Sequence, residues 1–487
     1  NWPYKDCVLE GGQSTEEGLD TYFEYSEKTK SYEEKQAKRK EIFFNSVLAH
    51  DEIDRLFDHK ALTNWKRFTK DGEQEVKEIK RDEDGTIREN LIIKGNNLLA
   101  LHSLKKQFIG KIKLIYIDPP YNTGNDGFKY NDNFNHSTWL TFMKNRLEVA
   151  RELLRDDGVI FVQCDDNEQA YLKVLMDEVF GRENFVSSFI RKTGIAARID
   201  AKFISKEHDY IICFSKKILS VKLNKEAVSN LDSYNLQDEY VEKRGKFKLN
   251  KLDRGSISYS KSLDYPINAP DGTLIYPGGK SESKGWCWRW SKDKFDWGLK
   301  NGFIVFKKND GWSVYFKQYQ FVDNQDKLIE RENPYKSLMI EDFNNEIGTA
   351  EMTEMFGNKI FVYPKPECLI KRIIEMSTEK DDIVLDYHLG SGTTCAVAHK
   401  MGRQYIGVEQ MDYVETIACE RLRKVIQGEQ GGISKSVNWQ GGGDFIYFEL
   451  AKWNETAKEK IFDCESLEEL EAFFDEMYER YFLNYNL

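Results

Sequence analysis

A short apolar run that ends in two consecutive prolines near residue 120 constrains the fold more than any other feature. Residues 114–117 have the length and composition of a buried β-strand, and Asp118-Pro119-Pro120-Tyr121 follows directly. Proline has no amide hydrogen for a β-ladder and a fixed φ, so the strand must end at Asp118. The sequence therefore predicts a carboxylate and a rigid turn with an aromatic side chain at the tip of a strand.

These residue types suit chemistry on the exocyclic amine of a nucleobase. Such a nitrogen is a poor nucleophile because its lone pair is delocalised into the ring. The Asp118 carboxylate and the Pro119 carbonyl, held by the fixed proline φ, would accept its two N–H bonds and favour a lone pair on nitrogen. Tyr121 would stack on a base that has left the duplex. The four residues alone also fit a strand that ends in an ordinary proline turn.

A second strand and turn lie more than 260 residues downstream. Residues 382–386 read as a buried strand, and a turn containing Gly390 and Gly392 leads into a helical pattern. Glycines let a ligand approach the backbone, and a helix N-terminus attracts anionic groups. The next strand ends in Glu409, an acid suited to ribose hydroxyls. No lysine follows the glycines, which argues against an ATP-type phosphate loop.

In a doubly wound α/β sheet, ligands bind outside the carboxyl ends of the strands, where the strand order reverses. The strands before Asp118 and Gly390 would be neighbours at that point. One cavity at their adjacent ends explains both motifs.

With both motifs in this order, the chain resembles a permuted (beta-class) DNA adenine-N6 methyltransferase. More narrowly, it is similar to the modification (Mod) subunit of Type III restriction–modification systems. The likeness rests on DPPYNTG (118–124), GVIFVQCDD (158–166), FVYPKPE (361–367) and DYHLGSGTT (386–394). It implies an α/β fold, a doubly wound Rossmann-like sheet that uses S-adenosylmethionine, with an inserted β-rich target-recognition domain and helical terminal regions.

The resemblance also implies a role for individual residues. Catalysis would fall to Asp118, Pro119, Pro120 and Tyr121. His388 stands where relatives more often have Phe. The cofactor would be bound by Asn96, Asp118, Lys365, Asp386, His388, Gly390, Ser391, Gly392, Thr393 and Glu409. We expect DNA contacts from Tyr121, Asn122, Arg191, Lys192, Arg198 and Arg289, and no metal site.

Composition divides the chain into five segments. Five of the ten tryptophans fall between Trp286 and Trp312, among turn residues and short aromatic strands, which predicts a β-rich insertion. The chain ends in an amphipathic helical pattern and begins with Glu- and Lys-rich residues at helix-like spacing. Together with the resemblance, which implies the roles of the middle segments, this predicts an N-terminal helical region (1–90), a methyltransferase core in two halves (91–215 and 346–450), a target-recognition domain (216–345) and a C-terminal helical region (451–487).

The charge is distributed unevenly. The chain has a net charge of −11, but residues 191–340 hold 28 Lys and Arg against 19 Asp and Glu, an excess of +9. Such asymmetry indicates one module that faces nucleic acid on an otherwise acidic body.

Several classes of protein are disfavoured. No apolar run approaches 18 residues, so we expect a cytoplasmic protein without a membrane segment. The eight cysteines lack metal-ligand spacing, and none follows a proline, as the nucleophile of a cytosine-C5 methyltransferase would. By resemblance, the expected partners are double-stranded DNA, a second copy in a homodimer and a restriction (Res) subunit.

Two alternatives remain from the sequence. A cytosine-N4 DNA methyltransferase uses the same amine chemistry, although its relatives more often carry Ser in place of Asp118. A non-catalytic DNA-binding specificity subunit is the other, and it would be expected to show damage in one of the two motifs.

Overall fold

The structure is a computed structural model that describes residues 62–123, 136–194, 203–228, 231–255, 259–280, 285–450 and parts of 461–480. Before residue 62 it describes the strands β1 (Cys7–Glu10), β2 (Leu19–Ser26), β3 (Ser31–Lys38) and β4 (Ile42–Asn45). The chain forms two compact units, one of residues 1–224 and 336–487 and the other of residues 225–335. No helix within the described ranges has both the length and the apolar character needed to cross a membrane.

The larger unit is built on an eleven-stranded mixed sheet, ordered β21-β10-β11-β9-β8-β22-β23-β7-β24-β5-β6. The six strands from β9 to β24 run parallel, and antiparallel pairs flank them on both sides. In chain order the strands are β5 (Leu62–Thr69), β6 (Gly72–Glu75), β7 (Leu91–Lys94), β8 (Ile112–Ile117), β9 (Leu154–Cys164), β10 (Phe185–Lys192), β11 (His208–Ser215), β21 (Leu338–Met339), β22 (Ile383–Asp386), β23 (Gln404–Glu409) and β24 (Phe445–Leu450).

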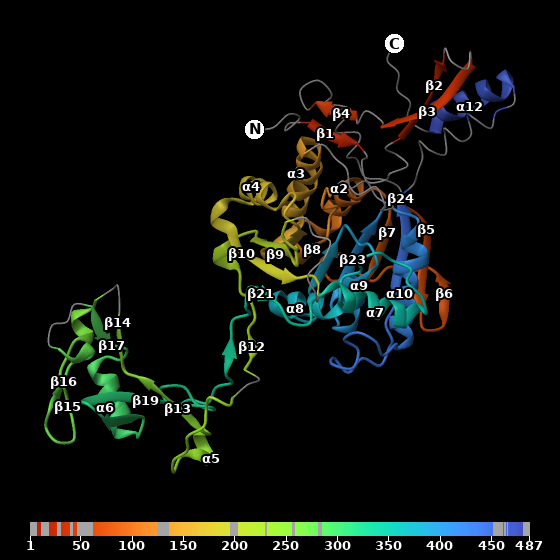
Figure 1. Ribbon diagram of the computed structural model, residues 1–487. Coiled ribbons are helices and arrows are strands. Elements are labelled where there is room, and N and C mark those ends of the chain that lie inside the picture. The colour runs from red at the N-terminus through yellow and green to blue at the C-terminus, as the bar shows by residue number, and fades with distance from the viewer. Residues whose placement is uncertain are drawn as a thin grey trace. The chain divides into compact units, whose positions relative to one another are not determined.

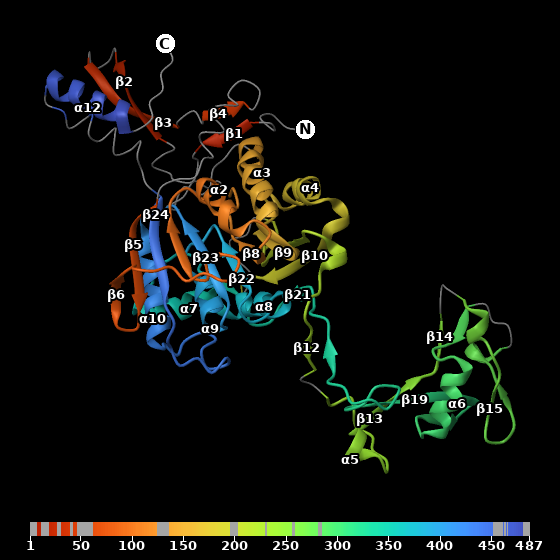
Figure 2. The same cartoon turned by 180° about the vertical axis from the view of Figure 1, so that it is seen from behind.

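The strands β8 and β22, which carry the two motifs, are direct neighbours in the middle of this sheet (Figure 2; Figure 1 shows the same sheet from the other side). Leu114 pairs with Val384 and Ile115 with Leu385, in parallel. From this pair the sheet grows in opposite directions, through β9 on one side and β23 on the other. The predicted neighbourhood at the point where the strand order reverses is therefore confirmed, and so is the doubly wound α/β fold class.

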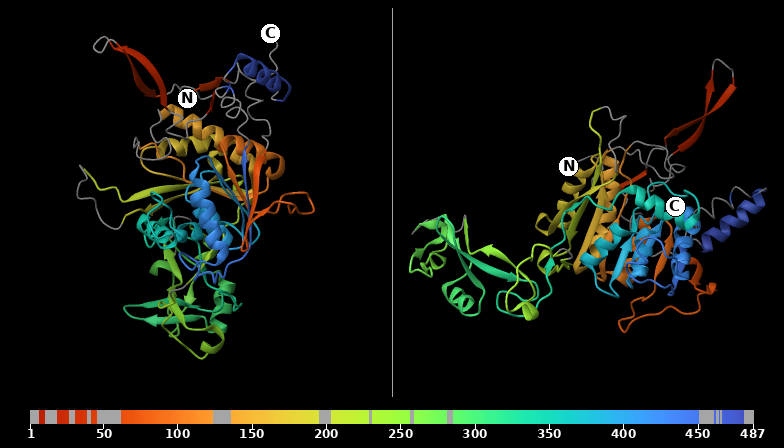
Figure 3. Two further views of the ribbon diagram at one scale, coloured as in Figure 1. Left: turned by 90° about the vertical axis from the view of Figure 1, so that its right-hand side faces the viewer. Right: turned by 60° about the horizontal axis from the view of Figure 1, so that its bottom comes forward.

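Helices cover both faces of the sheet, as the left view of Figure 3 shows. One face forms a continuous apolar core with α2 (Asn97–Phe108), α3 (His136–Leu153) and α4 (Gln169–Phe180). On the other face lie α8 (Glu367–Ser377), α9 (Thr393–Lys400) and α10 (Glu420–Gln427), with α7 (Asn345–Phe356) beside them. Every residue of β8 and β22 is buried, which explains why both strands are apolar apart from Lys113 in β8 and Asp386 at the end of β22.

The smaller unit has its own core around Trp288, Trp290 and Phe303. An antiparallel sheet of β13 (Phe247–Lys251), β19 (Trp312–Tyr319) and β18 (Ile304–Lys308) packs with α6 (Lys292–Lys300). The remaining elements are the short α5 (Val241–Arg244) and the strand pairs β12 (Glu226–Ala227) with β20 (Glu332–Asn333), β14 (Asp253–Gly255) with β17 (Trp286–Trp288), and β15 (Ile267–Asn268) with β16 (Leu274–Ile275). The unit is β-rich and lies inside the segment 216–345 expected for it.

The N-terminal region differs from the helical expectation. Its described elements up to residue 75 are strands, and Phe43 and Phe44 belong to β4. The other apolar residues of the expected helical stripe lie outside the described residues. β5 pairs along β24 at the margin of the large sheet, so a tertiary partner overrides the local helical spacing. Near the other terminus, α12 (Leu467–Arg480) is a helix, as expected.

Candidate active site

A cavity of about 510 Å³ lies where β8, β22 and β23 end. It brings together predicted residues from four separate stretches of the chain. These are Asp118, Pro119, Pro120, Tyr121, Lys365, Asp386, His388, Gly390, Ser391, Thr393 and Glu409.

Asp118 is held by two neighbours within this cavity. Its Oδ1 accepts a hydrogen bond of 2.7 Å from the Tyr121 hydroxyl, and its Oδ2 forms an ion pair with Lys365 Nζ. Burial and the charge of Asp118 raise the pKa of Tyr121 well above its usual value, so the phenol keeps its proton and remains a donor. Trp139 donates from Nε1 to the Pro120 carbonyl at 2.8 Å and thereby fixes the turn from the core side.

The glycine turn after β22 has the backbone geometry that glycine permits. Gly390 and Gly392 have φ of +55° and +79°, and Gly392 caps the start of α9. A Cβ at Gly392 would approach Ala418 to 3.1 Å. Glu409 at the end of β23 ties the turn down, because its Oε2 accepts from the Gly390 amide at 2.9 Å.

Two buried carboxylates border the turn. Burial raises the pKa of Asp386 to about 7, and burial also raises the pKa of Glu409. Beside them, His388 is neutral, since burial and the charge of Arg146 lower its pKa well below the usual value. Asn97 Nδ2 lies 3.4 Å from His388 Nε2 and orients the ring.

These groups fit S-adenosylmethionine. Among the described residues, no cation is one of the main groups that set the pKa of Asp386 and Glu409, and both suit the ammonium and hydroxyl donors of an amino-acid end and a ribose. Lys365 supplies a cation for a carboxylate, and the glycines leave the backbone open to a ligand. An apolar ligand would not explain why aspartate, glutamate and lysine side chains line this cavity.

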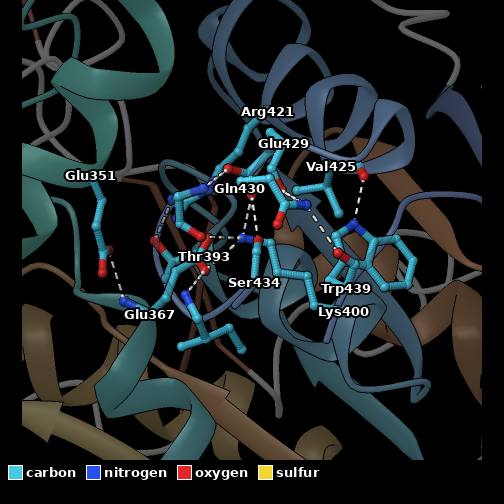
Figure 4. A network of polar contacts seen from close by, with 12 residues as sticks. Glu351, Glu367, Thr393, Lys400, Arg421, Val425, Glu429, Gln430, Ser434 and Trp439 are labelled. Atoms are coloured by element: carbon cyan, nitrogen blue, oxygen red, sulfur yellow. Dashed lines mark hydrogen bonds and ion pairs between the residues drawn. The ribbon is translucent and has the colours of Figure 1, made fainter. Parts of the chain in front are cut away.

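A polar network behind the turn is drawn in Figure 4. Glu367, buried at the start of α8, accepts from Arg421 at 2.9 Å and from Lys400 at 2.7 Å. Arg421 also donates to Thr393 Oγ1 at 2.7 Å, and Thr393 in turn donates to the Lys365 carbonyl at 3.1 Å. The Glu367 amide donates to Glu351 at 2.9 Å. The network therefore connects α7, α8, α9 and α10 to the main chain that carries Lys365.

Comparison with known proteins agrees with this geometry. The family model described as DNA methylase matches residues 112–420. The chain is 45% identical to the probable Type III restriction–modification enzyme HindVI Mod subunit of Haemophilus influenzae, over all of this chain and 76% of that protein. It is 33% identical to the EcoPI Mod subunit of Escherichia phage P1, over 67% of this chain and 57% of that protein. The chain belongs to the DNA methylase family.

The predicted likeness of this methylase to Type III Mod subunits is thus confirmed, together with the predicted class of enzyme, a DNA methyltransferase. Two solved structures match this chain distantly. PvuII cytosine-N4 DNA methyltransferase has a TM-score of 0.38 at 14% identity, covering 72% of this chain and 90% of that one. A putative DNA modification methylase of Thermus thermophilus has a TM-score of 0.35 at 15% identity, covering 69% and 95%.

One expected DNA contact of the methylase is wrong. Arg191 is 1% exposed and donates two hydrogen bonds to the Asp209 carboxylate, from Nε at 2.8 Å and from a terminal nitrogen at 2.5 Å. It belongs to β10, and its guanidinium neutralises a buried carboxylate instead of reaching a phosphate. Lys192 ends the same strand, and Arg198 lies outside the described residues.

Three other predicted residues lie away from the cavity lining or are engaged elsewhere. Asn96 caps α2 by accepting from the Leu98 amide at 2.9 Å and does not line the cavity, so its expected contact with the cofactor is not seen. Asn122 donates to Glu168 at 2.7 Å. Arg289 is exposed on the smaller unit, where its Nε donates to the Lys251 carbonyl at 3.2 Å.

Sequence reasoning missed one polar wall of the cavity. Gln163 donates to Asp209 at 2.7 Å and accepts from the Tyr116 hydroxyl, while Arg191 donates to Asn345 Oδ1 at 3.0 Å. Tyr116, Arg191, Asp209 and Asn345 line the cavity. The available signal was the presence of polar residues in otherwise apolar buried strands, which need partners to be tolerated there.

Proposed function

We propose that this methylase transfers a methyl group from S-adenosylmethionine to N6 of an adenine that has left double-stranded DNA. In this proposal it is the modification subunit of a Type III restriction–modification system. One observation carries it: Asp118 and the glycine turn, 264 or more residues apart along the chain, border one cavity.

The residues of the chain contribute mainly by positioning. The Asp118 carboxylate and the Pro119 carbonyl accept the two N6–H bonds and turn the nitrogen lone pair toward the donor. S-adenosylmethionine, when bound, supplies an electrophilic methyl group on its sulfonium. The Asp118 carboxylate would lie beside the positive charge that N6 gains on methylation, and this carboxylate or water would take up the surplus proton.

Tyr121 offsets part of the free-energy cost of extruding the base. Leaving the stack costs a few kcal/mol. Stacking on an aromatic ring returns about 1–3 kcal/mol per base. The Tyr121 ring lies in the cavity next to Asp118, where a base presented to that carboxylate would meet it.

The two alternatives are less well supported. Asp118 rather than Ser at the catalytic position, together with similarity to Type III Mod subunits, favours adenine N6 over cytosine N4. A non-catalytic specificity subunit would not need an intact turn and an intact Asp-Pro-Pro-Tyr at one cavity.

The further partners belong to the same proposal. The smaller unit, residues 225–335, would recognise the DNA sequence, with Arg289 among its exposed cations. By likeness to Mod subunits, a second copy and a Res subunit would assemble with this chain in the cytoplasm, where its DNA substrate lies. Light scattering of the purified protein tests the dimer.

The test of function is transfer of isotopically labelled methyl from S-adenosylmethionine to DNA. We expect transfer by the wild type and none above background by Asp118→Ala, because the amine loses its charged acceptor. Binding of S-adenosylhomocysteine, measured by calorimetry, should be retained in Asp118→Ala and shows that the cavity is intact. Turnover by the variant equal to that of the wild type would reject the role of Asp118.

A further inference from the structure

Both carboxylate oxygens of Asp118 are already engaged by groups of the chain itself. Tyr121 donates to Oδ1 and the Lys365 ammonium contacts Oδ2. Each oxygen keeps a second lone pair, but at Oδ2 the incoming neutral amine must compete with a charged donor, which is the stronger competitor. The Lys365 ammonium is therefore a stand-in for the target amine, in the place where that amine would donate its hydrogen bond.

The contact is partly shielded from water. The Lys365 side chain is 11% exposed and that of Asp118 is 27% exposed. Solvent weakens such a pair less than one on the surface, so Lys365 is a significant obstacle unless another anion draws it away.

The main chain at Lys365 is fixed, so only the side chain is free to change partner. Thr393 binds the Lys365 carbonyl and is itself held by Arg421 in the network of Figure 4. On the other side, any side chain in place of Gly348 would collide with the Pro364 carbonyl. Lysine has a flexible four-carbon stem, which lets its ammonium swing between nearby anions from a fixed backbone.

The hydrogen bond from Thr393 to the Lys365 carbonyl also places Lys365 next to the glycine turn. Thr393 opens α9 directly after Gly392, so the hydrogen bond from its hydroxyl joins the Lys365 main chain to the end of the cavity that suits an amino-acid group. The other described lysine and arginine side chains lining the cavity, Lys206 and Arg191, pair with Asp166 and Asp209.

We infer that Lys365 is a positioning residue that exchanges one anion for another: Asp118 when the cofactor site is empty, and the carboxylate of the cofactor when it is bound. The exchange frees Oδ2 of Asp118 for the target amine, so the base site becomes available only after the cofactor site is filled. This inference rests on the proposed function and adds an order of binding to it.

The test compares two probes by calorimetry, S-adenosylhomocysteine and its decarboxylated analogue. We expect the wild type to prefer the carboxylated probe by roughly tenfold, the scale of one charge-assisted contact. Lys365→Met should lose this preference, and Lys365→Arg should keep part of it.

The direction in which Asp118→Asn changes the affinity for S-adenosylhomocysteine distinguishes the exchange from a structural ion pair. It removes the competing charge with little change in shape, so S-adenosylhomocysteine should bind a few-fold more tightly than to the wild type. In the Lys365→Met background the same substitution should have no effect. A purely structural ion pair predicts the opposite, weaker binding in Asp118→Asn, and that result, or an equal effect in both backgrounds, overturns the inference.

Extrusion of the base gives a readout independent of cofactor affinity. In a duplex with 2-aminopurine at the methylated position found by sequencing, wild-type fluorescence should rise only when S-adenosylhomocysteine is present. Lys365→Met should show the rise without it, and equal dependence on the probe in both proteins contradicts the inference.

If no variant binds S-adenosylhomocysteine or transfers methyl groups, the proposed function itself fails, whereas methyl transfer with unchanged probe preferences refutes only the exchange at Lys365.

Discussion

Tyr121 contributes an aromatic ring and a hydroxyl, and separate substitutions distinguish them. The ring would stack on the extruded base, and the hydroxyl orients Asp118 through Oδ1. Tyr121→Phe keeps the stack, so methyl transfer should fall only a few-fold. Tyr121→Ala loses about 1–3 kcal/mol of stacking. Its kcat/KM should therefore fall about 10- to 100-fold.

Duplex affinity, measured by fluorescence anisotropy, is the control for both variants and should be unchanged, because contacts outside the flipped base are retained. Equal activity of Tyr121→Phe and Tyr121→Ala would show that stacking on this ring does not matter.

Residues in local motifs were predictable, and residues defined by long-range pairing were not. Asp118 and Gly390 each follow a recognisable strand, and their chemistry can be read from neighbours in the sequence. Arg191 was expected to contact DNA because nothing nearby in the sequence identifies Asp209, on the adjacent strand β11, as its partner. The exchange at Lys365 likewise depends on a contact between residues 247 positions apart.

The helix α7 carries Glu351, an acid with a raised pKa that accepts a hydrogen bond from the Glu367 amide. Burial and the charge of Glu367 raise the pKa of Glu351 to about 7, above the usual 4.5. Between these two pH values the folded state holds a proton that the unfolded state releases, so this group stabilises the fold at low pH and loses its contribution as pH rises to 7. Glu351→Gln removes the effect and keeps an oxygen for the Glu367 amide.

We expect Glu351→Gln to be close to the wild type near pH 5 and to exceed its free energy of unfolding by about 2–3 kcal/mol at pH 8. Denaturant unfolding at both pH values measures this. Glu354→Gln, an exposed position on the same helix, is the matched control and should change neither value. A pH dependence in Glu351→Gln identical to that of the wild type would show that Glu351 titrates normally.

Among the elements, strands with continuous apolar runs were predicted well because full burial leaves only one pattern. β8, β22 and β23 coincide with their expected positions within about two residues. The strands β5 and β6 were not predicted, since their polar and charged residues follow no strand alternation and their pairing is set by β24 and by each other. Local propensity there is weaker than the gain from extending the sheet.

The whole molecule is an α/β sheet whose two halves are separated in sequence by the unit of residues 225–335. That insertion can vary without disturbing β8 and β22, because both strands lie in the larger unit. Residues 225–335 hold 19 Lys and Arg against 16 Asp and Glu, an excess of +3 in a chain of net charge −11, and the wider segment 191–340 has the larger excess of +9 that fits a role at DNA. The catalytic chemistry and the recognition of sequence would thus reside in separately folded parts of one chain.

The most direct test of the account is mass spectrometry of nucleosides from DNA of cells that lack other methyltransferases and express this chain. We expect N6-methyladenine with the wild type and none with Asp118→Ala. N4-methylcytosine in place of N6-methyladenine, or the same modified base in both samples, would contradict methyl transfer to adenine at Asp118.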